Sequence, residues 1–154
     1  MTTFNGTTGD DSLTAIAGND TYQLGNGNDT ITYNASVDAF GVLTWNYGFD
    51  TIISTDGGVD SPNYDKVVLD FSFEYLWGRK VGLNIELSIY AHNVSNSNSD
   101  PGVADEVGKI IFVNAFSNSM SDRLSRLEGP RGMYFEAIAS PTADLHGHTA
   151  TSGW

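Results

Sequence analysis

Apolar residues recur at an interval of nine positions in the first part of the chain. Leu13, Tyr22 and Ile31 each stand between two polar residues, and the stretches that separate them are rich in Gly, Asn, Asp and Thr. A single large apolar residue between polar neighbours fits a very short strand with one inward-facing side chain. The pattern therefore predicts three-residue strands joined by polar turns.

Gly and Asp recur in the same register as these apolar residues. When residues 6–32 are written in rows of nine, every row has Gly at its fourth position and Asp at its sixth. These residues are Gly9, Gly18 and Gly27, and Asp11, Asp20 and Asp29. The fifth position is Asp10, Asn19 or Asn28. Three successive rows in register indicate a repeat architecture, in which each row is one structural unit.

The repeat weakens after the third row. Residues 33–41 keep Asp38 at the sixth position and Phe40 at the eighth, but Ser36 replaces the glycine. After a short insertion, the segment 48–52 (Gly-Phe-Asp-Thr-Ile) restores the pattern around Asp50, and residues 65–67 (Asp-Lys-Val) are a weak echo of it. We therefore expect a damaged fourth row and a fifth row beyond the insertion.

The second half of the chain has β-type patterning. Leu83, Ile85, Leu87 and Ile89 alternate with polar residues, which is the two-residue period of a strand with one buried face. Strands are also expected at 67–69, 109–113 and 133–139. A capping pattern and a shared apolar face predict a short helix at 119–128, with a stop at Gly129-Pro130. The polar stretch 93–108 is expected to be a loop.

Charge and composition narrow the function classes. The net charge is −12 with only seven Lys and Arg, which argues against binding of nucleic acid or of an anionic membrane surface. No apolar run is long enough for a membrane span, and the N-terminal residues lack the pattern of a secretory signal. The chain has no cysteine, so thiolate metal sites and disulfides are excluded. Most acidic residues are Asp in Gly-, Asn-, Thr- and Ser-rich stretches, which favours loop carboxylates that bind a hard cation such as Ca²⁺.

The rows themselves suggest how calcium is bound. Glycine tolerates positive φ, so a Gly-rich turn can direct backbone carbonyls inward beside the Asp carboxylate. Two rows make one coil, so Asp11 is expected to stack with Asp29 and Asp20 with Asp38. The same logic places Leu13 over Ile31 and Tyr22 over Phe40. The residues expected to provide calcium ligands are Gly6, Thr8, Asp10, Asp11, Ala17, Asn19, Asp20, Asn26, Asn28, Asp29, Asp38 and Asp50.

These rows resemble the RTX, or haemolysin-type, repeat, whose consensus is Gly-Gly-x-Gly-x-Asp-x-apolar-x. The first two glycines of that consensus are mostly replaced here, by Thr7, Ala15, Ile16 and Leu24. The resemblance implies a right-handed parallel β-roll (β-helix) that binds Ca²⁺ between stacked turns. It also implies a secreted or cell-surface protein, exported without an N-terminal signal by a type I-like route, and a β-rich flank that caps the roll.

The predicted fold class is therefore all-β, with a short parallel β-roll running into a β-rich C-terminal cap. We expect one domain over 1–154, with the roll at about 5–55, the capping part at about 56–140 and a flexible tail at 141–154. The predicted function is that of a calcium-binding RTX module that folds and is stabilised on binding calcium.

Two other function classes remain open. Trp45, Tyr47 and Trp77 could stack on sugar rings in a calcium-dependent carbohydrate-binding module, with the insertion at 42–47 as the place to look. An enzyme has no positive support, because there is no Gly-x-Ser-x-Gly motif and His92 stands alone in the expected folded region, without the pattern of a catalytic partner. His146 and His148 form a pair without a third ligand in the expected tail. The oligomeric state is not predicted.

Overall fold

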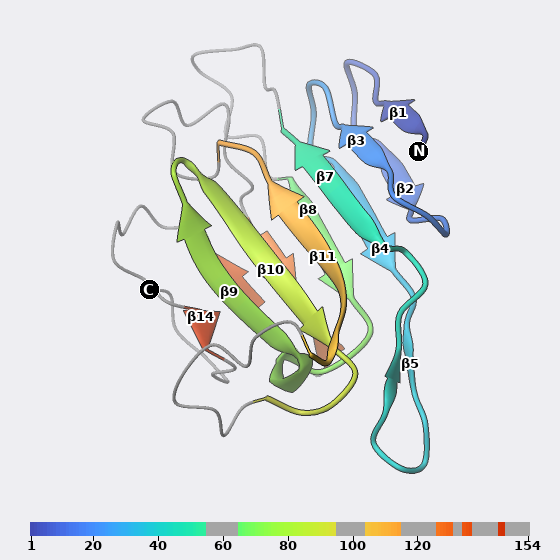
Figure 1. Ribbon diagram of the computed structural model, residues 1–154. Helices are drawn as coiled ribbons and strands as arrows, with labels where there is room; N and C mark the ends of the chain where they lie inside the picture. The colour runs from blue at the N-terminus through green and yellow to red at the C-terminus, as the bar shows by residue number, and fades with distance from the viewer. Residues whose placement is uncertain (55–64, 95–103, 115–125, 131–133, 137–144, 147–154) are drawn as a thin grey trace.

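The computed structural model describes residues 1–54, 65–94, 104–114, 126–130, 134–136 and 145–146 (Figure 1). Its regular elements are strands, with one short 3-10 helix, η1 (Phe73–Tyr75). The strands are β1 (Thr3–Asn5), β2 (Ser12–Thr14), β3 (Thr21–Gln23), β4 (Thr30–Tyr33), β5 (Ser36–Val37), β6 (Leu43–Thr44), β7 (Phe49–Ile53), β8 (Lys66–Leu69), β9 (Leu76–Val81), β10 (Asn84–Tyr90), β11 (Glu106–Phe112), β12 (Arg126–Glu128), β13 (Tyr134–Glu136) and β14 (Leu145–His146). The predicted all-β class is confirmed.

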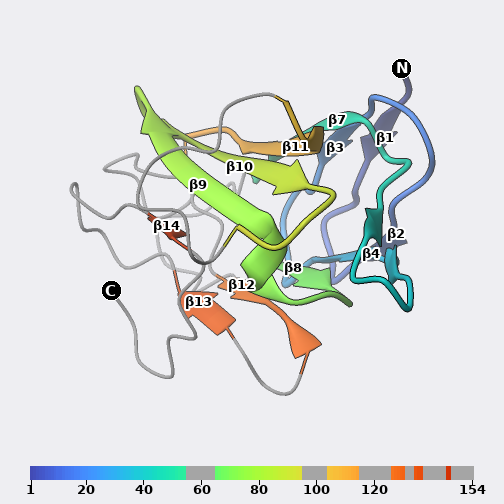
Figure 2. The same ribbon diagram turned by 60° about the horizontal axis from the view of Figure 1, so that its bottom comes forward.

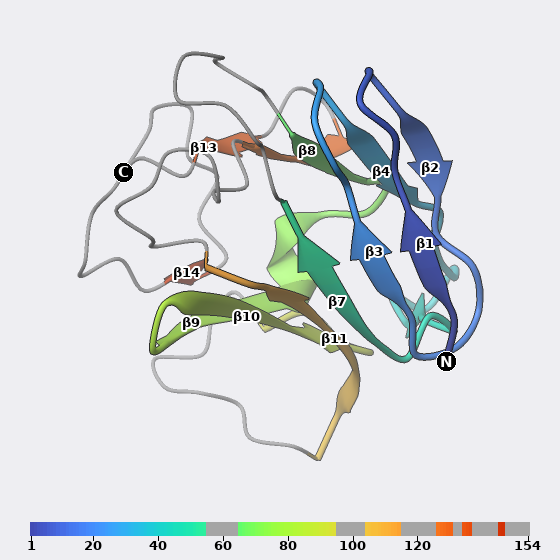
Figure 3. The ribbon, with the colours of Figure 1, turned by 90° about the horizontal axis from the view of Figure 1, so that it is seen from above.

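Consecutive strands of the repeat region alternate between two sheets. One sheet has the order β1-β3-β7-β11-β10-β9-β14, and its first four strands are parallel. The other has the order β13-β12-β8-β4-β2, in which β2, β4, β8 and β12 are parallel. Figure 3 shows the two sheets as two layers, with β1, β3 and β7 in one and β2, β4 and β8 in the other. In the repeat region, one strand from each sheet and the two turns beside them therefore make one coil of the chain.

One inward residue from each strand forms a column along each sheet. In the first sheet the strand register aligns Phe4, Tyr22, Ile52 and Phe112. In the second it aligns Leu13, Ile31, Val67 and Leu127. The members next to the chain start are partly exposed, and the others are buried. The expected stacking of Leu13 over Ile31 is confirmed, because the x-apolar-x triplet leaves only its central side chain to face inward.

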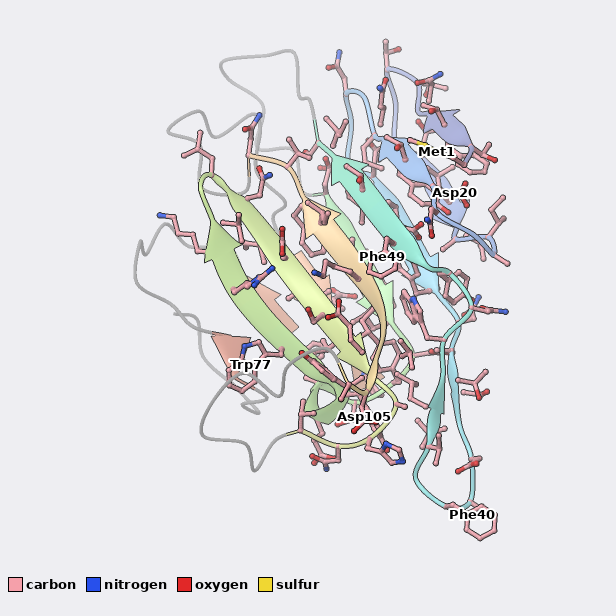
Figure 4. All side chains as sticks on the ribbon, viewed as in Figure 1. Met1, Asp20, Phe40, Phe49, Trp77 and Asp105 are labelled. Atoms are coloured by element: carbon pink, nitrogen blue, oxygen red, sulfur yellow. The ribbon has the colours of Figure 1, made fainter. Side chains whose placement is uncertain are left out.

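The expected stacking of Tyr22 over Phe40 is wrong. Tyr22 lies beside Ile52, whereas Phe40 is 91% exposed at the tip of a hairpin formed by β5 and β6. Figure 4 shows Phe40 at the far end of this hairpin, away from both sheets. Ser36 replaces the glycine that a repeat turn needs, and the chain forms a hairpin at this point instead of another coil. The coil resumes at β7, where Gly48 has φ +69°.

The β-rich second half continues both sheets. β9 and β10 form an antiparallel hairpin, and β11 pairs with β10 on one side and with β7 on the other. Figure 2 shows β12 and β13 in the opposite layer from β9 and β10. The strands expected at 67–69, 83–89 and 109–113 are present with shifted ends. Leu83 lies just before β10 and is 53% exposed, so the expected buried face begins at Ile85.

Two C-terminal expectations need correction. Residues 126–128 of the expected helix form the strand β12 instead, and residues 119–125 lie outside the described part. Leu127 continues the column of Ile31 and Val67, so pairing with β8 overrides the local helical pattern. In the expected flexible tail, residues 145–146 form β14 and pair with β9. The expected strand at 133–139 is present as β13, while 133 and 137–139 lie outside the described residues.

Aromatic side chains fill the space between the sheets. Tyr33 stacks on Trp45 with ring centroids 5.2 Å apart, and it meets Tyr22 and Tyr47 edge-on. Phe4 stacks on Tyr22 at 5.0 Å. Such large rings bury much apolar area per residue, which suits a narrow core between three-residue strands. Within the described part of the chain, no helix is long and apolar enough to cross a membrane.

Candidate metal centre

The turn of the first row lies directly against the turn of the third. The N–H of Asn26 donates to the carbonyl of Thr7 at 3.2 Å, and the N–H of Asn28 donates to Oδ1 of Asp10 at 2.8 Å. The N–H of Asp11 donates to Oδ1 of Asp29 at 2.8 Å. The expected stacking of Asp11 with Asp29 is therefore confirmed.

Glycine makes this close approach feasible. Gly27 has φ +126°, and a Cβ added to it would lie 2.6 Å from the carbonyl carbon of Gly9 in the neighbouring turn. A side chain at this position would force the two turns apart and would also strain the backbone. The glycine that recurs at the fourth position of each row therefore permits the close contact between turns as well as the shape of each turn.

The turn of the second row stacks on the turn before β7, and not on the fourth row. The N–H of Asp20 donates to Oδ1 of Asp50 at 2.8 Å, and the N–H of Phe49 donates to Oδ1 of Asn19 at 2.9 Å. Asp38 instead accepts from the N–H groups of Phe40 and Val42 inside the hairpin turn. The expected pairing of Asp20 with Asp38 is wrong, because the carboxylate of Asp38 closes its own turn.

A third aspartate extends the Asp11–Asp29 column. Oδ1 of Asp65 accepts from the N–H of Asp29 at 2.9 Å, and Asp65 is fully buried. In the sequence, Asp65 is only a weak echo of the repeat, and it was not among the expected calcium ligands. Asp65 follows Asp29 by 36 residues, which is twice the 18 residues between Asp11 and Asp29. This multiple of the coil length is the sequence signal that could have identified Asp65.

One rule describes these contacts. In each column, Oδ1 of an aspartate accepts from the backbone N–H of the equivalent residue one coil earlier in the chain. Asp20 follows the same rule, since its Oδ1 accepts from the N–H of Thr2 at 2.6 Å. We call this arrangement the aspartate ladder; its members are Asp11, Asp29 and Asp65 in one column, and Asp20 and Asp50 in the other. Each ladder bond joins two coils and satisfies one backbone donor.

In Asp50 and Asp65, the last member of each column, a hydroxyl group donates a hydrogen bond to the second carboxylate oxygen. Oδ2 of Asp50 accepts from the hydroxyl of Tyr33 at 3.0 Å, and Oδ2 of Asp65 accepts from the hydroxyl of Ser54. Burial raises the pKa of Asp50 to about 6, although the bonds from Asp20 N–H and Tyr33 oppose this rise, and the charge of Asp20 adds to it. Burial, followed by the charge of Asp50, raises the pKa of Tyr33 well above its ordinary value. Neither Tyr33 nor Ser54 was expected from the sequence.

The members nearer the chain start are satisfied differently. Oδ2 of Asp11 accepts from the N–H of Thr7 at 2.6 Å and from its hydroxyl at 3.0 Å, within the same turn. Asp20 is 3% exposed, and its Oδ2 has no hydrogen-bond partner among the described residues. Figure 4 shows Asp20 on the outer turns of the coil stack, near Met1. A buried carboxylate oxygen without a partner is costly and is an expected position for an ion.

The remaining expected ligands lie in the same turns. Gly6, Thr8 and Asp10 belong to the turn before β2, and Asn26 and Asn28 to the turn before β4. Ala17 and Asn19 belong to the turn before β3. These stacked turns therefore hold the expected residues from the first three rows and, with Gly48-Phe49-Asp50, the fifth; only Asp38 lies elsewhere. Within the described part, no three His, Cys, Asp or Glu side chains gather as a metal-holding group.

The three aromatic residues considered for sugar binding are buried. Trp45 and Tyr47 are 8% and 6% exposed and belong to the main core, where they pack against Tyr33. Trp77 is 7% exposed and packs with Tyr90 and Val94 in a second, smaller cluster. They do not form an exposed row beside the turns, so the sugar-stacking platform expected of them is absent.

In comparisons with known proteins, no family model and no curated protein matches this chain.

Proposed function

We propose that this chain is a calcium-binding module of the RTX type, in which a short parallel β-roll closes around Ca²⁺ held between stacked turns. The observation that carries the proposal is the aspartate ladder, because it repeats carboxylates in register from one coil to the next, beside the Gly-rich turns of the first three rows. Further support comes from the composition, since 12 negative charges remain uncompensated in a chain that buries Asp20, Asp29, Asp50 and Asp65.

The chemistry of the turns suits calcium. Ca²⁺ takes six to eight oxygen ligands, and backbone carbonyls serve as well as carboxylates, so a site needs only two aspartates when turn carbonyls supply the rest. A carboxylate oxygen has more than one lone pair, and it can accept a ladder bond while it contacts a cation. We assign one site to the turns of Asp11 and Asp29 and another to those of Asp20 and Asp50. The unpartnered oxygen of Asp20 favours the second site most directly.

Calcium binding would stabilise the fold by neutralising buried charge. A ligand that binds only the folded chain adds about 2.7 kcal/mol to the free energy of unfolding when its free concentration is 100 times Kd. Such a gain raises Tm by roughly 5 to 10 °C for a chain of this size. A protein that gains stability where calcium is abundant suits export, and we extend the proposal to a secreted or cell-surface location.

The first prediction tests the calcium site with isosteric variants. Asparagine keeps the Oδ1 acceptor of the ladder but removes the charge, so Asp11→Asn plus Asp29→Asn should retain the metal-free fold and lose much of the calcium-induced rise in Tm. Asp20→Asn plus Asp50→Asn should do the same at the second site. Calorimetric titration and thermal melts in EDTA, in calcium and in magnesium provide the measurements.

Asp38→Asn is the matched control, because Asp38 lies in a hairpin turn outside the ladder. It should respond to calcium as the unmodified chain does. A melting temperature that is the same in EDTA and in excess calcium would refute the proposal. Equal responses from the Asp38 control and both ladder variants would refute the assigned sites.

A further inference from the structure

The chain contains two Asn-Gly pairs, and the structure places them in different environments. Asn5-Gly6 lies at the end of β1, where Asn5 pairs in register with Gln23. Asn26-Gly27 lies in the turn between β3 and β4, and Asn26 is exposed. An Asn-Gly pair is the chemical setting for spontaneous loss of the side-chain amide, because glycine has no side chain to hinder attack by its own backbone nitrogen.

The two glycine nitrogens differ in hydrogen bonding. The N–H of Gly6 donates to the carbonyl of Gln23 at 2.7 Å, and this hydrogen bond ties Gly6 to the end of β3. The N–H of Gly27 donates no hydrogen bond within the described part of the chain. The nitrogen that must attack is therefore tied in one pair and open in the other. This contrast gives one chain both a reactive site and its own internal reference.

The geometry points to Asn26-Gly27 as a site of spontaneous deamidation that acts on the stacked turns. The backbone nitrogen of Gly27 attacks Cγ of Asn26, a new N–Cγ bond forms, and the Cγ–Nδ2 bond breaks. Ammonia leaves with the proton from the attacking nitrogen, and a five-membered succinimide remains. Water then opens the ring at either carbonyl, which produces aspartate or isoaspartate at position 26. No oxidant and no reactant other than water is required.

The product changes the contact between the first and third rows. An isoaspartate routes the backbone through Cγ, which lengthens the chain between Gly25 and Gly27. That segment has no room for it, since the N–H of Asn26 donates to Thr7 and Gly27 packs against the backbone of Gly9. An ordinary aspartate keeps the backbone but adds a negative charge to a turn that already faces Asp10. We therefore expect isoaspartate to separate the turns and aspartate to disturb them less.

The second prediction compares the two pairs in one experiment. The full chain and two short peptides with the sequences around Asn5 and Asn26 are aged in mildly alkaline buffer, and peptide mapping by mass spectrometry follows each site. For each site, the rate in the full chain is divided by the rate in the matching peptide. This ratio should be about three- to tenfold higher for Asn26 than for Asn5, because release of Gly6 requires a backbone hydrogen bond to break. Equal suppression at both sites in the folded chain would overturn the assignment.

Variants separate the modification from its consequence. Asn26→Gln should retain its Tm on ageing, because the longer side chain closes an imide ring less readily, whereas Asn5→Gln should lose Tm as the unmodified chain does. Asn26→Asp supplies the charge without the longer backbone and should account for the smaller part of the loss. If aged Asn26→Gln loses Tm as fast as the unmodified chain, the proposed effect on the stacked turns is refuted.

The inference does not depend on calcium, and the same experiment distinguishes the two proposals. Ageing in calcium should slow conversion at Asn26 if the ion holds the turn, because ring closure requires the turn to move. A rate at Asn26 that calcium leaves unchanged counts against the calcium module, while the preference for Asn26 over Asn5 still supports the modification site.

Discussion

Aspartates of the same sequence pattern have different roles in the structure. Asp50 is buried and accepts from Asp20 N–H and the hydroxyl of Tyr33, whereas Asp38 closes a hairpin turn at the surface. The register of the rows predicted Asp11, Asp20 and Asp29 correctly as equivalent turn positions. It could not separate Asp38 from Asp65, because the difference depends on which strand follows each residue and where that strand pairs. Tyr33 came close to Asp50 only through folding.

The third prediction concerns pH and Asp50 in the metal-free chain. Its folded pKa, about 6, lies above the ordinary value of 3.8, so the folded state binds this proton more tightly than the unfolded state. The contribution of Asp50 to stability is therefore full below about pH 4, falls as pH rises to about 6, and stays low above that. Urea unfolding in EDTA across this range should show the loss.

Asp50→Asn should remove this slope, because asparagine keeps an acceptor for Asp20 N–H and has no proton to release. Asp38→Asn serves as the control and should retain the slope. If the stability of the unmodified chain minus that of Asp50→Asn rises between pH 4 and pH 6, the pKa of Asp50 is not raised in the folded state.

At the scale of elements, the hairpin β5–β6 is the largest departure from a regular repeat. It replaces the fourth row, and the strand that the row would have supplied to the first sheet comes from β7. The tip of the hairpin is joined to the rest of the structure, since the hydroxyl of Tyr75 donates to the carbonyl of Gly41 at 3.1 Å and Leu43 is buried. The missing glycine at position 36 signalled that the row was damaged, but it did not indicate which segment would take its place.

The fourth prediction compares Ile52 with Phe40, the residue observed over Tyr22 with the residue expected there. Ile52 is 1% exposed, so Ile52→Ala should lower the free energy of unfolding by about 2 to 5 kcal/mol. Phe40→Ala should change it by less than about 0.5 kcal/mol, since an exposed side chain loses few contacts. Chemical unfolding of both variants measures the difference. A larger loss for Phe40→Ala would place Phe40, and not Ile52, in the inward column.

At the scale of the whole molecule, acidic and basic residues are unevenly distributed along the chain. Residues 1–50 contain six aspartates and no Lys or Arg, while Arg79, Lys109 and Lys66 make ion pairs on the strands of the second half. Lys109 contacts both Glu86 and Glu106, and Arg79 contacts Glu86 at 2.7 Å. Burial acts to raise the pKa of Glu86, but Arg79 and Lys109 outweigh it and hold the pKa below its ordinary value. The repeat region therefore has no basic residue of its own to offset the charge of its aspartates.

The fifth prediction follows from this excess of negative charge. In EDTA, sodium chloride should raise Tm, because screening shortens the Debye length from about 10 Å at 0.1 M to about 3 Å at 1 M and weakens the repulsion. Millimolar calcium should raise Tm more than sodium chloride at equal ionic strength, since it acts at defined turns. Thermal melts at matched ionic strength test this, and identical effects of the two salts would indicate general screening only.

The sequence by itself determined the all-β class, the three-residue strands and the alignment of Asp11 with Asp29, because each is set by a local pattern that repeats at a fixed interval. Tertiary structure decided what the interval could not specify. It paired Asp50 with Asp20, added Asp65 to the ladder, buried Trp45 and Tyr47 in the core, and made a strand of residues 126–128. These outcomes depend on long-range strand pairing and on competition for a limited buried volume, and neither is encoded within one nine-residue row.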